Sequence, residues 1–523
     1  MLFIEPFFLM VFLPVVLAAF WGTSRLAGGE AGLAVLLTAS ILFYGKFGLG
    51  FCALLLVSIA INFVVGAYLA GSAASPQRRK LALLLGLMWN FGALIYFKYL
   101  LSLEGLFSST AVAPPGVIDL AIPVGISFYT FHQAVFLLDA HARKPVVMEY
   151  LGGLHGMVGK LKAAMRYAAF VCFFPQLVIG PIVYLQEFAA SVRRPDFGRF
   201  KRSDVEVGLT LAAIGMFEKL VIADGLAPMA GSLFTVAAAG AVVDAATAWT
   251  GVVAYYLQLY FDFSGYSDMA IGLARVVGVR LPINFDSPLR ASGIADFYRR
   301  WHITLTRCIA RFLFTPLSLW GTRTSLALKL GRRGQKLFSS WLPLLVNFEI
   351  IALWHGARGT FLLFGVIHGL WYILETEMKA SKTWREWARR RSETSVRRWG
   401  QAATVLPLML TFALFASPDL ESFRHVLQGL IGTGGGDAMA IAPRSLGVLL
   451  LAIVIVWLTP NSVELLGRYR PGDRSWINPS TTPALLGRMR WRPNLAWGAF
   501  FTVVTAASFL SMAHKAPFLY QGF

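Results

Sequence analysis

The stretch that decides the fold begins Asp296-Phe-Tyr-Arg-Arg-Trp-His-Ile-Thr-Leu-Thr and continues, further along the chain, with Leu353-Trp-His-Gly-Ala-Arg and Ile367-His-Gly-Leu-Trp. Each piece carries one histidine in apolar and aromatic surroundings: His302, His355 and His368. Polar groups at bilayer depth are costly, so they are functional candidates by default. A neutral imidazole tolerates such a place better than a charged group does, and it titrates near physiological pH. We therefore expect residues 296–375 to form the core of a catalytic site within a membrane.

The whole chain has the composition of an integral membrane protein. Of its 523 residues, 57% are hydrophobic and only 14% are charged, against about 25% charged residues in a soluble domain. A bilayer-spanning helix needs about 20 mainly apolar residues, and on that criterion roughly eleven to thirteen segments qualify as transmembrane or re-entrant helices. We predict one all-α, polytopic membrane domain over residues 1–523. The run Met1–Phe20 lacks a basic start and a convincing cleavage site, so we expect it to be a retained membrane segment.

The charge balance is basic, with 47 Lys and Arg against 27 Asp and Glu and a formal net charge of +20. The basic residues gather in short loops between apolar runs, as the positive-inside tendency requires of cytoplasmic loops. Topology and anionic lipid headgroups explain this excess better than nucleic-acid binding does. A basic cytoplasmic face would also attract a phosphate-rich acyl donor. Residues 379–398 are charged without a spanning pattern, and we predict a cytoplasmic basic loop there.

Proline and glycine interrupt two apolar stretches. Pro123 and Gly125 suggest a kinked or broken helix, and residues 173–183 suggest a re-entrant or broken segment. We interpret His132, which lies in the first stretch, as a packed and hydrogen-bonded polar residue. Residues 296–313 instead have apolar side chains at helical steps, and predict an amphipathic segment that lies in the interface or dips into the membrane. The run Tyr96-Phe-Lys-Tyr99 suits an interface belt.

Residues 248–277 combine two acids with serines and aromatics in an apolar run. Asp262 and Asp268 are six residues apart and so do not share a helix face. A charged aspartate inside a bundle needs a partner or hydrogen-bond donors. We expect this segment to brace the wall of the site, the alternative being a direct catalytic role for one of the two acids. Nearby, Glu218, Lys219 and Asp224 are expected to pair with one another or to lie at the interface.

The chemistry that the histidines suggest is general base catalysis. His302 and His355 can meet only through folding, and an imidazole near a hydroxyl can take its proton and make the oxygen a nucleophile. A second polar side chain can orient the substrate or stabilise the oxyanion that forms when a thioester carbonyl is attacked. The sequence has no Gly-x-Ser-x-Gly elbow. Cys308 could hold an acyl group, although nothing marks it as an activated thiolate.

Other chemistries fit the central stretch less well. A metal site built from its three histidines would lack both an acidic ligand and His-x-x-x-His spacing, so we predict no metal. The three cysteines of the chain are scattered, with no disulfide framework or metal spacing. Arg299 and Arg300 are expected to bind lipid phosphates or to pair with acids. The alternative for these two arginines is contact with a phosphorylated donor.

The central motifs resemble those of the membrane-bound O-acyltransferase (MBOAT) superfamily. More narrowly, they resemble the bacterial alginate O-acetylation membrane protein group. Motifs along the whole chain support the resemblance: Phe12-Leu-Pro, Tyr96-Phe-Lys-Tyr, Pro123-Val-Gly-Ile-Ser-Phe-Tyr, Phe174-Pro-Gln-Leu-Val-Ile-Gly-Pro, Gln258-Leu-Tyr-Phe-Asp-Phe-Ser-Gly-Tyr-Ser-Asp-Met-Ala and Ala516-Pro-Phe-Leu-Tyr.

The resemblance implies a helical fold in the bacterial inner membrane, with a central funnel or tunnel. It implies transfer of an acyl group, in particular acetyl, from a cytoplasmic thioester donor such as acetyl-CoA, with no bound cofactor. The acceptor would be an exported polysaccharide, reached through an extracytoplasmic partner acetyltransferase. His355 matches the catalytic histidine of the family, His302 its second polar position, and His368 a frequent histidine of the family. We place Trp301 and Trp354 among the supporting residues.

One position departs from the family pattern. Family members commonly continue Trp-His-Ile-Ser-Leu-Ser with an Arg-Asp-Tyr step, whereas residues 310–312 here read Ala-Arg-Phe. The acid and the hydroxyl are absent, and the arginine is displaced by one residue.

Other functions remain open at this point. The enzymatic alternative is D-alanyl transfer to teichoic acid, which requires a Gram-positive wall. A proton-coupled transporter would relay protons through buried histidines, but the chain has no matching halves. A catalytically inert scaffold that recruits a partner enzyme is disfavoured by the retention of both principal histidines.

Overall fold

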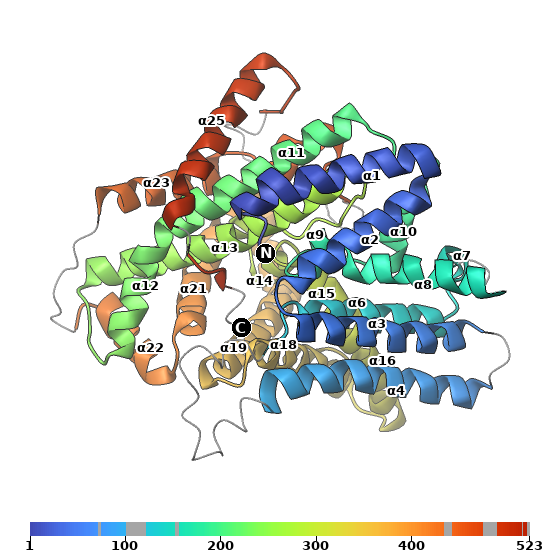
Figure 1. Ribbon diagram of the computed structural model, residues 1–523. Helices are drawn as coiled ribbons and strands as arrows, with labels where there is room; N and C mark the ends of the chain where they lie inside the picture. The colour runs from blue at the N-terminus through green and yellow to red at the C-terminus, as the bar shows by residue number, and fades with distance from the viewer. Residues whose placement is uncertain are drawn as a thin grey trace, which may run out of the picture.

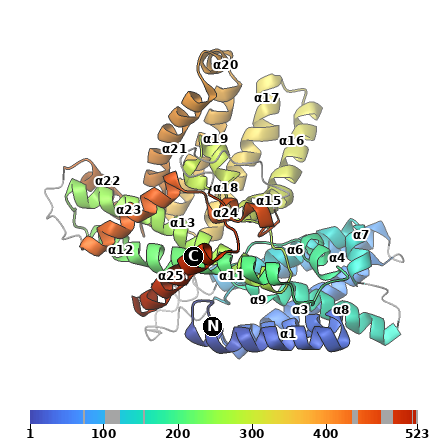
Figure 2. The same ribbon diagram turned by 90° about the horizontal axis from the view of Figure 1, so that it is seen from above.

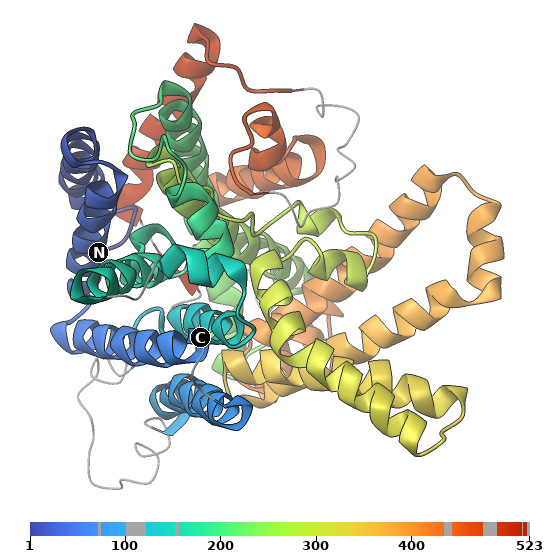
Figure 3. The same cartoon turned by 90° about the vertical axis from the view of Figure 1, so that its right-hand side faces the viewer.

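The computed structural model describes residues 1–71, 75–100, 122–151, 156–433, 442–473, 489–514 and 516–519. Over these ranges every regular element is a helix, and the only extended pairing is an isolated bridge between Pro282 and Asp473. The all-α prediction is therefore confirmed. Figure 1 shows a body of packed helices, and the views of Figures 2 and 3 show two helical arms that extend from it.

Six helices of the described ranges are long and apolar enough to cross a membrane: Phe8–Ala27, Leu49–Ala70, Pro76–Tyr99, Arg332–His355, Gly359–Ala380 and Glu393–Ala416. Three shorter apolar helices accompany them: Gly29–Gly45, Pro443–Leu458 and Leu495–Ser511. The chain is a multi-pass membrane protein. Fewer helices reach full spanning length than the apolar runs suggested, because other apolar segments, such as α6 (Ile126–His141), are too short for a bilayer of about 30 Å.

The N-terminal part forms one layer of helices, seen in blue and cyan in Figure 1. Helices α2 (Gly29–Gly45) and α3 (Leu49–Ala70) are joined by a short turn at residues 46–48. The basic run 76–80 is the first part of α4 (Pro76–Ile95), whose amino end is capped by the Ser75 hydroxyl. Helix α6 packs on both α3 and α4.

The centre of the molecule is α13 (Ala245–Val276), which is buried along almost its whole length. It packs tightly against α11 (Arg202–Phe217), and Figure 1 shows the two helices running together through the middle. The close approach depends on facing glycines. A Cβ on Gly208 would lie 2.6 Å from the carbonyl oxygen of Gly272, and a Cβ on Gly265 would lie 2.6 Å from that of Gly215. Small residues permit such backbone contacts between membrane helices.

Two arms leave the body at the end opposite α1 (Leu13–Ala27), as Figures 2 and 3 show. One contains α16 (Thr315–Ala327) and α17 (Arg332–Lys336), and leads into α18 (Leu342–His355). The other contains α19 (Gly359–Ala380), α20 (Lys382–Arg389) and α21 (Glu393–Ala416). The predicted basic loop 379–398 is thus mostly helical, because the hydroxyls of Ser381 and Ser392 cap the amino ends of α20 and α21.

The two proline-containing stretches differ in outcome. Pro123 and Gly125 precede α6 and do not break it. Gly125 has φ +74°, and a Cβ there would lie 2.6 Å from the carbonyl oxygen of Leu177, so glycine allows two chain segments to meet. Residues 173–183 form only the short α9 (Phe174–Leu177) followed by a turn and irregular chain, which confirms the broken segment. His132 accepts a hydrogen bond from the Val183 amide at 3.0 Å, as a packed polar residue should.

The helical spacing of residues 296–313 does not give one continuous helix. Helix α14 (Ile294–Tyr298) ends before the motif histidine, and α15 (Ile303–Ile309) begins after it. His302 lies between them with φ +44° and ψ +51°, a left-handed conformation that is uncommon for a residue other than glycine. The break places the histidine at the amino end of α15, where backbone N–H groups need other partners.

Candidate active site

His302 is held at the break between α14 and α15 by Asn284. The side-chain oxygen Oδ1 of Asn284 lies 3.0 Å from His302 Nδ1, and it accepts hydrogen bonds from the Thr304 amide at 3.3 Å and the Thr304 hydroxyl at 2.9 Å. The Asn284 carbonyl also accepts from the Ile303 amide at 3.0 Å. These bonds satisfy donors at the start of α15 and offset the strain of the left-handed residue. The ring of His302 is buried, which lowers the pKa of the imidazole to about 3 and keeps it neutral.

His355 is the last residue of α18 and is also buried. Its ring lies in an aromatic setting, with ring centroids 4.7 Å from Trp354, 4.9 Å from Phe415 and 6.2 Å from Phe361. The Phe415 ring is nearly perpendicular to the imidazole, at 87°. An apolar cage of this kind excludes water from the imidazole and holds its orientation.

Trp354 connects the two principal histidines. Its ring centroid lies 6.5 Å from that of His302 and 4.7 Å from that of His355. The structure therefore brings together the two histidines that the sequence marked, although they come from different elements. Trp301 packs on the His302 side, where its ring is 5.1 Å from Phe285 and stacks on Phe297 at 5.4 Å.

Lys98 is a site residue that sequence reasoning missed. The run 96–99 was assigned to an interface belt, but the Lys98 ammonium donates a hydrogen bond to the Trp354 carbonyl and lies 5.3 Å from the centroid of the Trp354 ring. The Tyr99 hydroxyl likewise donates to the carbonyl of Leu353. A half-buried cation thus lies beside the end of α18 that carries His355. The motif itself was visible in the sequence, but its partner was not.

His368 belongs to a neighbouring group on α19. Its Nδ1 lies 2.7 Å from the Tyr298 hydroxyl, and its ring stacks on Phe364 at 3.9 Å. Phe364 in turn lies 5.3 Å from Phe415, which contacts His355. His368 is therefore linked to the principal pair through aromatic rings.

Thiolate chemistry at Cys308 finds little support. Burial raises the pKa of the Cys308 thiol to about 12, which disfavours a nucleophilic thiolate. Among the residues that the structure describes, no group of three or more His, Cys, Asp or Glu side chains is arranged to hold a metal ion.

Asp262 and Asp268 occupy α13 on either side of the residues that face the site. Phe263 directs its ring edge-on to His302, with centroids 4.7 Å apart. Asp262 pairs with Lys219 at 2.6 Å and accepts from the Leu519 amide at 2.8 Å. Lys219 also pairs with Asp224 at 2.7 Å, as expected for that group. Asp268 lies beside Glu218 and accepts a hydrogen bond from Ser462. These contacts tie α13 to its neighbours, in keeping with the bracing interpretation.

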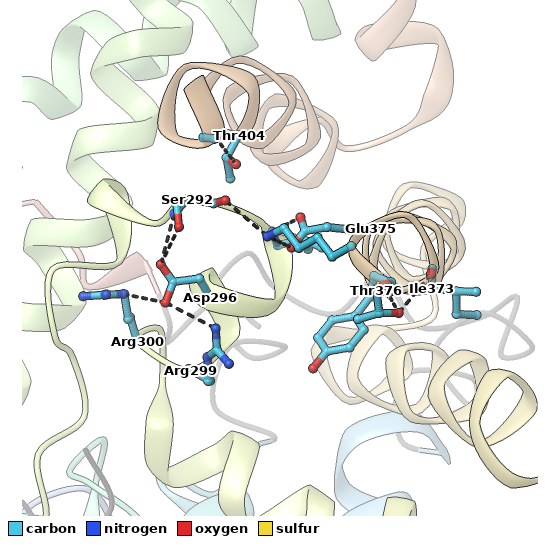
Figure 4. A network of polar contacts seen from close by, with 12 residues as sticks. Ser292, Asp296, Arg299, Arg300, Ile373, Glu375, Thr376 and Thr404 are labelled. Atoms are coloured by element: carbon cyan, nitrogen blue, oxygen red, sulfur yellow. Dashed lines mark hydrogen bonds and ion pairs between the residues drawn. The ribbon is translucent and has the colours of Figure 1, made fainter. Parts of the chain in front are cut away.

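Arg299 and Arg300 follow α14 in the chain and belong to the polar network around Asp296 that Figure 4 shows. Asp296 pairs with Arg300 at 2.9 Å and with Arg299 at 3.7 Å, and it accepts from the Ser292 amide at 3.0 Å. Burial opposes ionisation of Asp296, but its charged and hydrogen-bonded neighbours outweigh burial and lower the pKa of the carboxyl. Glu375 of α19 accepts from the Ile294 amide at 2.6 Å and so fixes the start of α14.

A polar cavity of about 340 Å³ adjoins this network. Its lining includes five cationic side chains, Arg290, Arg299, Arg300, Lys379 and Arg397, against two carboxylates, Asp296 and Glu393, together with the indole of Trp384. We call it the basic cavity. An excess of guanidinium and ammonium groups in a concave site suits a phosphorylated ligand.

Comparison with known proteins points to acyl transfer. Residues 158–411 match the model of the membrane-bound O-acyltransferase family. The chain is 31% identical over 520 residues to a peptidoglycan O-acetyltransferase of Helicobacter pylori. That alignment covers 93% of this chain and 94% of the relative. It is 32% identical over 470 residues to a probable alginate O-acetylase of Azotobacter vinelandii, in an alignment that covers 87% of this chain and 84% of the relative. A teichoic acid D-alanyltransferase of Bacillus subtilis is 22% identical over 289 residues, in an alignment that covers 55% of this chain and 65% of that protein.

Proposed function

We propose that this chain, which belongs to the membrane-bound O-acyltransferase family, moves an acetyl group from a cytoplasmic thioester donor towards an exported polysaccharide. Family membership makes the chain an O-acyltransferase. The acetyl group, the donor, the acceptor and the catalytic residues are the proposal. The observation that carries it is the meeting of His302 and His355 at the ring of Trp354, in buried surroundings.

In the proposed reaction His355 is the general base. Its imidazole takes the proton from an acceptor hydroxyl, and the oxygen attacks the thioester carbonyl. A C–O bond forms, the C–S bond breaks, and the leaving thiolate takes up a proton. His302 positions the reacting groups, and the aromatic cage excludes water that would otherwise hydrolyse the thioester.

The basic cavity supports a phosphorylated donor such as acetyl-CoA. It adjoins Asp296, Arg299 and Arg300, which lie a few residues before His302 in the chain. Phosphates bound there would lie on the face that carries the basic residues, and we assign this face to the cytoplasm of a bacterial inner membrane.

The nature of the relatives supports a polysaccharide acceptor. The two relatives aligned over most of the chain are named for O-acetylation of peptidoglycan and of alginate. The D-alanyltransferase matches a smaller part at lower identity, so D-alanyl transfer to teichoic acid is the second candidate. We further propose an extracytoplasmic partner acetyltransferase that completes transfer to the polymer. Proton-coupled transport has no comparable support.

The test is complementation in the native bacterium. Cells lacking the chain are supplied with wild type, His355→Ala, His302→Ala or His141→Ala, and ester-linked acetate on the envelope polysaccharide is measured. His141, at the carboxyl end of α6, serves as the control histidine. We expect His355→Ala to abolish acetylation, His302→Ala to reduce it and His141→Ala to retain it, at equal protein levels in the membrane. Full acetylation with His355→Ala would contradict the proposed base.

A further inference from the structure

We propose that Asn284 is a positioning residue that holds His302 in the tautomer with its proton on Nδ1, so that His302 acts through the lone pair on Nε2. The inference rests on the proposed function only where it gives His302 a part in the reaction. The tautomer itself follows from hydrogen bonds around Asn284. This residue lies in the turn-rich link between α13 and α14, far from the motif that marks the histidine.

The first step fixes the orientation of the Asn284 amide. The backbone N–H of Thr304 can only donate, and it points to the atom assigned as Asn284 Oδ1 at 3.3 Å. On the other side of the amide, Nδ2 donates to the Ser267 hydroxyl at 3.3 Å. A flipped amide would direct an N–H group at the Thr304 N–H. The oxygen of Asn284 therefore faces Thr304 and His302.

The Thr304 hydroxyl fits the same orientation. It accepts a hydrogen bond from the Ile182 amide at 3.0 Å, and it lies 2.9 Å from Asn284 Oδ1. Its single proton is thus available for Asn284. A hydroxyl can also accept from an amide N–H, so the contact that requires oxygen at this position is the one with the Thr304 backbone N–H, which can only donate.

The second step fixes the imidazole. His302 Nδ1 lies 3.0 Å from the same Asn284 oxygen. Two lone pairs at this distance would repel each other, so Nδ1 carries the proton. A neutral imidazole has one N–H, and Nε2 therefore carries the lone pair.

The tautomer limits what His302 can do. Nε2 can accept a proton or an O–H hydrogen bond, but in the neutral ring it cannot donate to a developing oxyanion. His302 could have had two roles. It can still orient the acceptor hydroxyl, but it cannot stabilise the oxyanion. Asn284 acts through His302 and does not itself touch the reacting atoms in this assignment.

The test is solid-state nitrogen NMR of the full chain in liposomes, with both ring nitrogens of histidine labelled. The His302 signal is identified by its loss in His302→Asn. We expect Nδ1 protonated and Nε2 unprotonated in wild type, and in Ser267→Ala, which removes only the outer partner of Asn284. Asn284→Leu should give a mixture of tautomers, and Asn284→Asp, which keeps an oxygen acceptor, should keep Nδ1 protonated. A wild-type ring protonated on Nε2, or an unchanged ring in Asn284→Leu, would overturn the assignment.

Kinetics then test the positioning role. Asn284→Leu should lower kcat about tenfold or more, the scale on which orienting partners act, with little change in KM for the donor, and Ser267→Ala should keep the wild-type kcat. A wild-type kcat in folded Asn284→Leu would overturn the role. If Asn284→Leu does not fold, the wild-type and Asn284→Asp spectra still decide the tautomer. If the spectra agree with the assignment but wild type transfers no acetyl group, the proposed function fails and the tautomer stands.

Discussion

Lys98 and Trp354, 256 residues apart in the sequence, are joined by a hydrogen bond from the lysine ammonium to the tryptophan carbonyl. The contact does two things at once. It satisfies a carbonyl in the last turn of α18, where a helix favours a cation. It also places a positive charge beside His355, in a buried setting where charge interactions are stronger than in water. Because His302 can only accept at Nε2, Lys98 is a candidate to stabilise the oxyanion.

Lys98→Met should therefore reduce acetyl transfer strongly. Loss of one donor to an oxyanion costs about 100-fold or more in kcat, whereas loss of a structural contact alone would cost much less. The measurement is the initial rate of transfer from a labelled thioester donor. Lys98→Arg should retain part of the rate, and Lys46→Met, at an exposed lysine, should retain all of it. A wild-type rate in Lys98→Met would remove Lys98 from the site.

Trp354 is expected to matter through its ring. Trp354→Phe keeps an aromatic surface between His302 and His355, and Trp354→Ala leaves a cavity between them. We expect a modest loss of rate in the first variant and a loss of about tenfold or more in the second, because misplaced catalytic groups are costly. Trp399→Ala, at an exposed tryptophan, is the control. Equal rates in the two Trp354 variants would argue against a positioning role for the ring.

The Ala310-Arg311-Phe312 departure is compensated by residues from other segments. Arg311 pairs with the buried Asp139 of α6, and its guanidinium lies 5.3 Å from the centroid of the Tyr184 ring. An arginine, an acid and a tyrosine thus still meet. Asp139→Asn should destabilise the protein by about 1–2 kcal/mol, since it removes the carboxylate shared by the partly exposed Arg311 and Lys144. A lowered midpoint of thermal unfolding in detergent would show this, with Glu421→Gln, in an exposed ion pair with Arg424, as control. An unchanged midpoint in Asp139→Asn would contradict the compensation.

The basic cavity should govern donor binding. Arg299→Ala should raise KM for acetyl-CoA several-fold and leave kcat nearly unchanged. The lost contact with the donor phosphates would stabilise the ground state and the transition state equally. The effect should shrink at high salt. Lys382→Ala removes a cation from α20, near but not lining the cavity, and should leave KM unchanged. Equal KM values for the two variants would place the donor elsewhere.

The sequence predicted the class of fold, and it marked the two principal histidines, whose catalytic role stays a prediction; both signals are local. Apolar composition requires helices in a membrane, and His302 and His355 stand out as polar groups within it. The partners Asn284 and Lys98 were not predictable from helical spacing. Asn284 lies in an irregular link 18 residues before His302, and Lys98 contacts Trp354 from 256 residues away. The helical break at His302 was missed for the same reason: residues 296–313 have helical spacing, but Asn284 and Glu375 stabilise the interrupted form.

The arm residues 379–398 show a different limit. Their charge suggested a loop, because spanning helices are recognised by apolar length. Short helices outside the bilayer need no such length, and Ser381 and Ser392 supply their caps. The capping serines were visible in the sequence and could have indicated these helices.

The most direct test of the central claim is transfer of labelled acetyl from acetyl-CoA by the purified chain in liposomes, with the proposed extracytoplasmic partner and an acceptor polysaccharide added. Wild type and His355→Ala are compared at equal amounts of folded protein, with His141→Ala as control. We predict ester-linked label with wild type and His141→Ala, and none above background with His355→Ala. Equal labelling by wild type and His355→Ala would contradict the claim that acyl transfer takes place at this histidine.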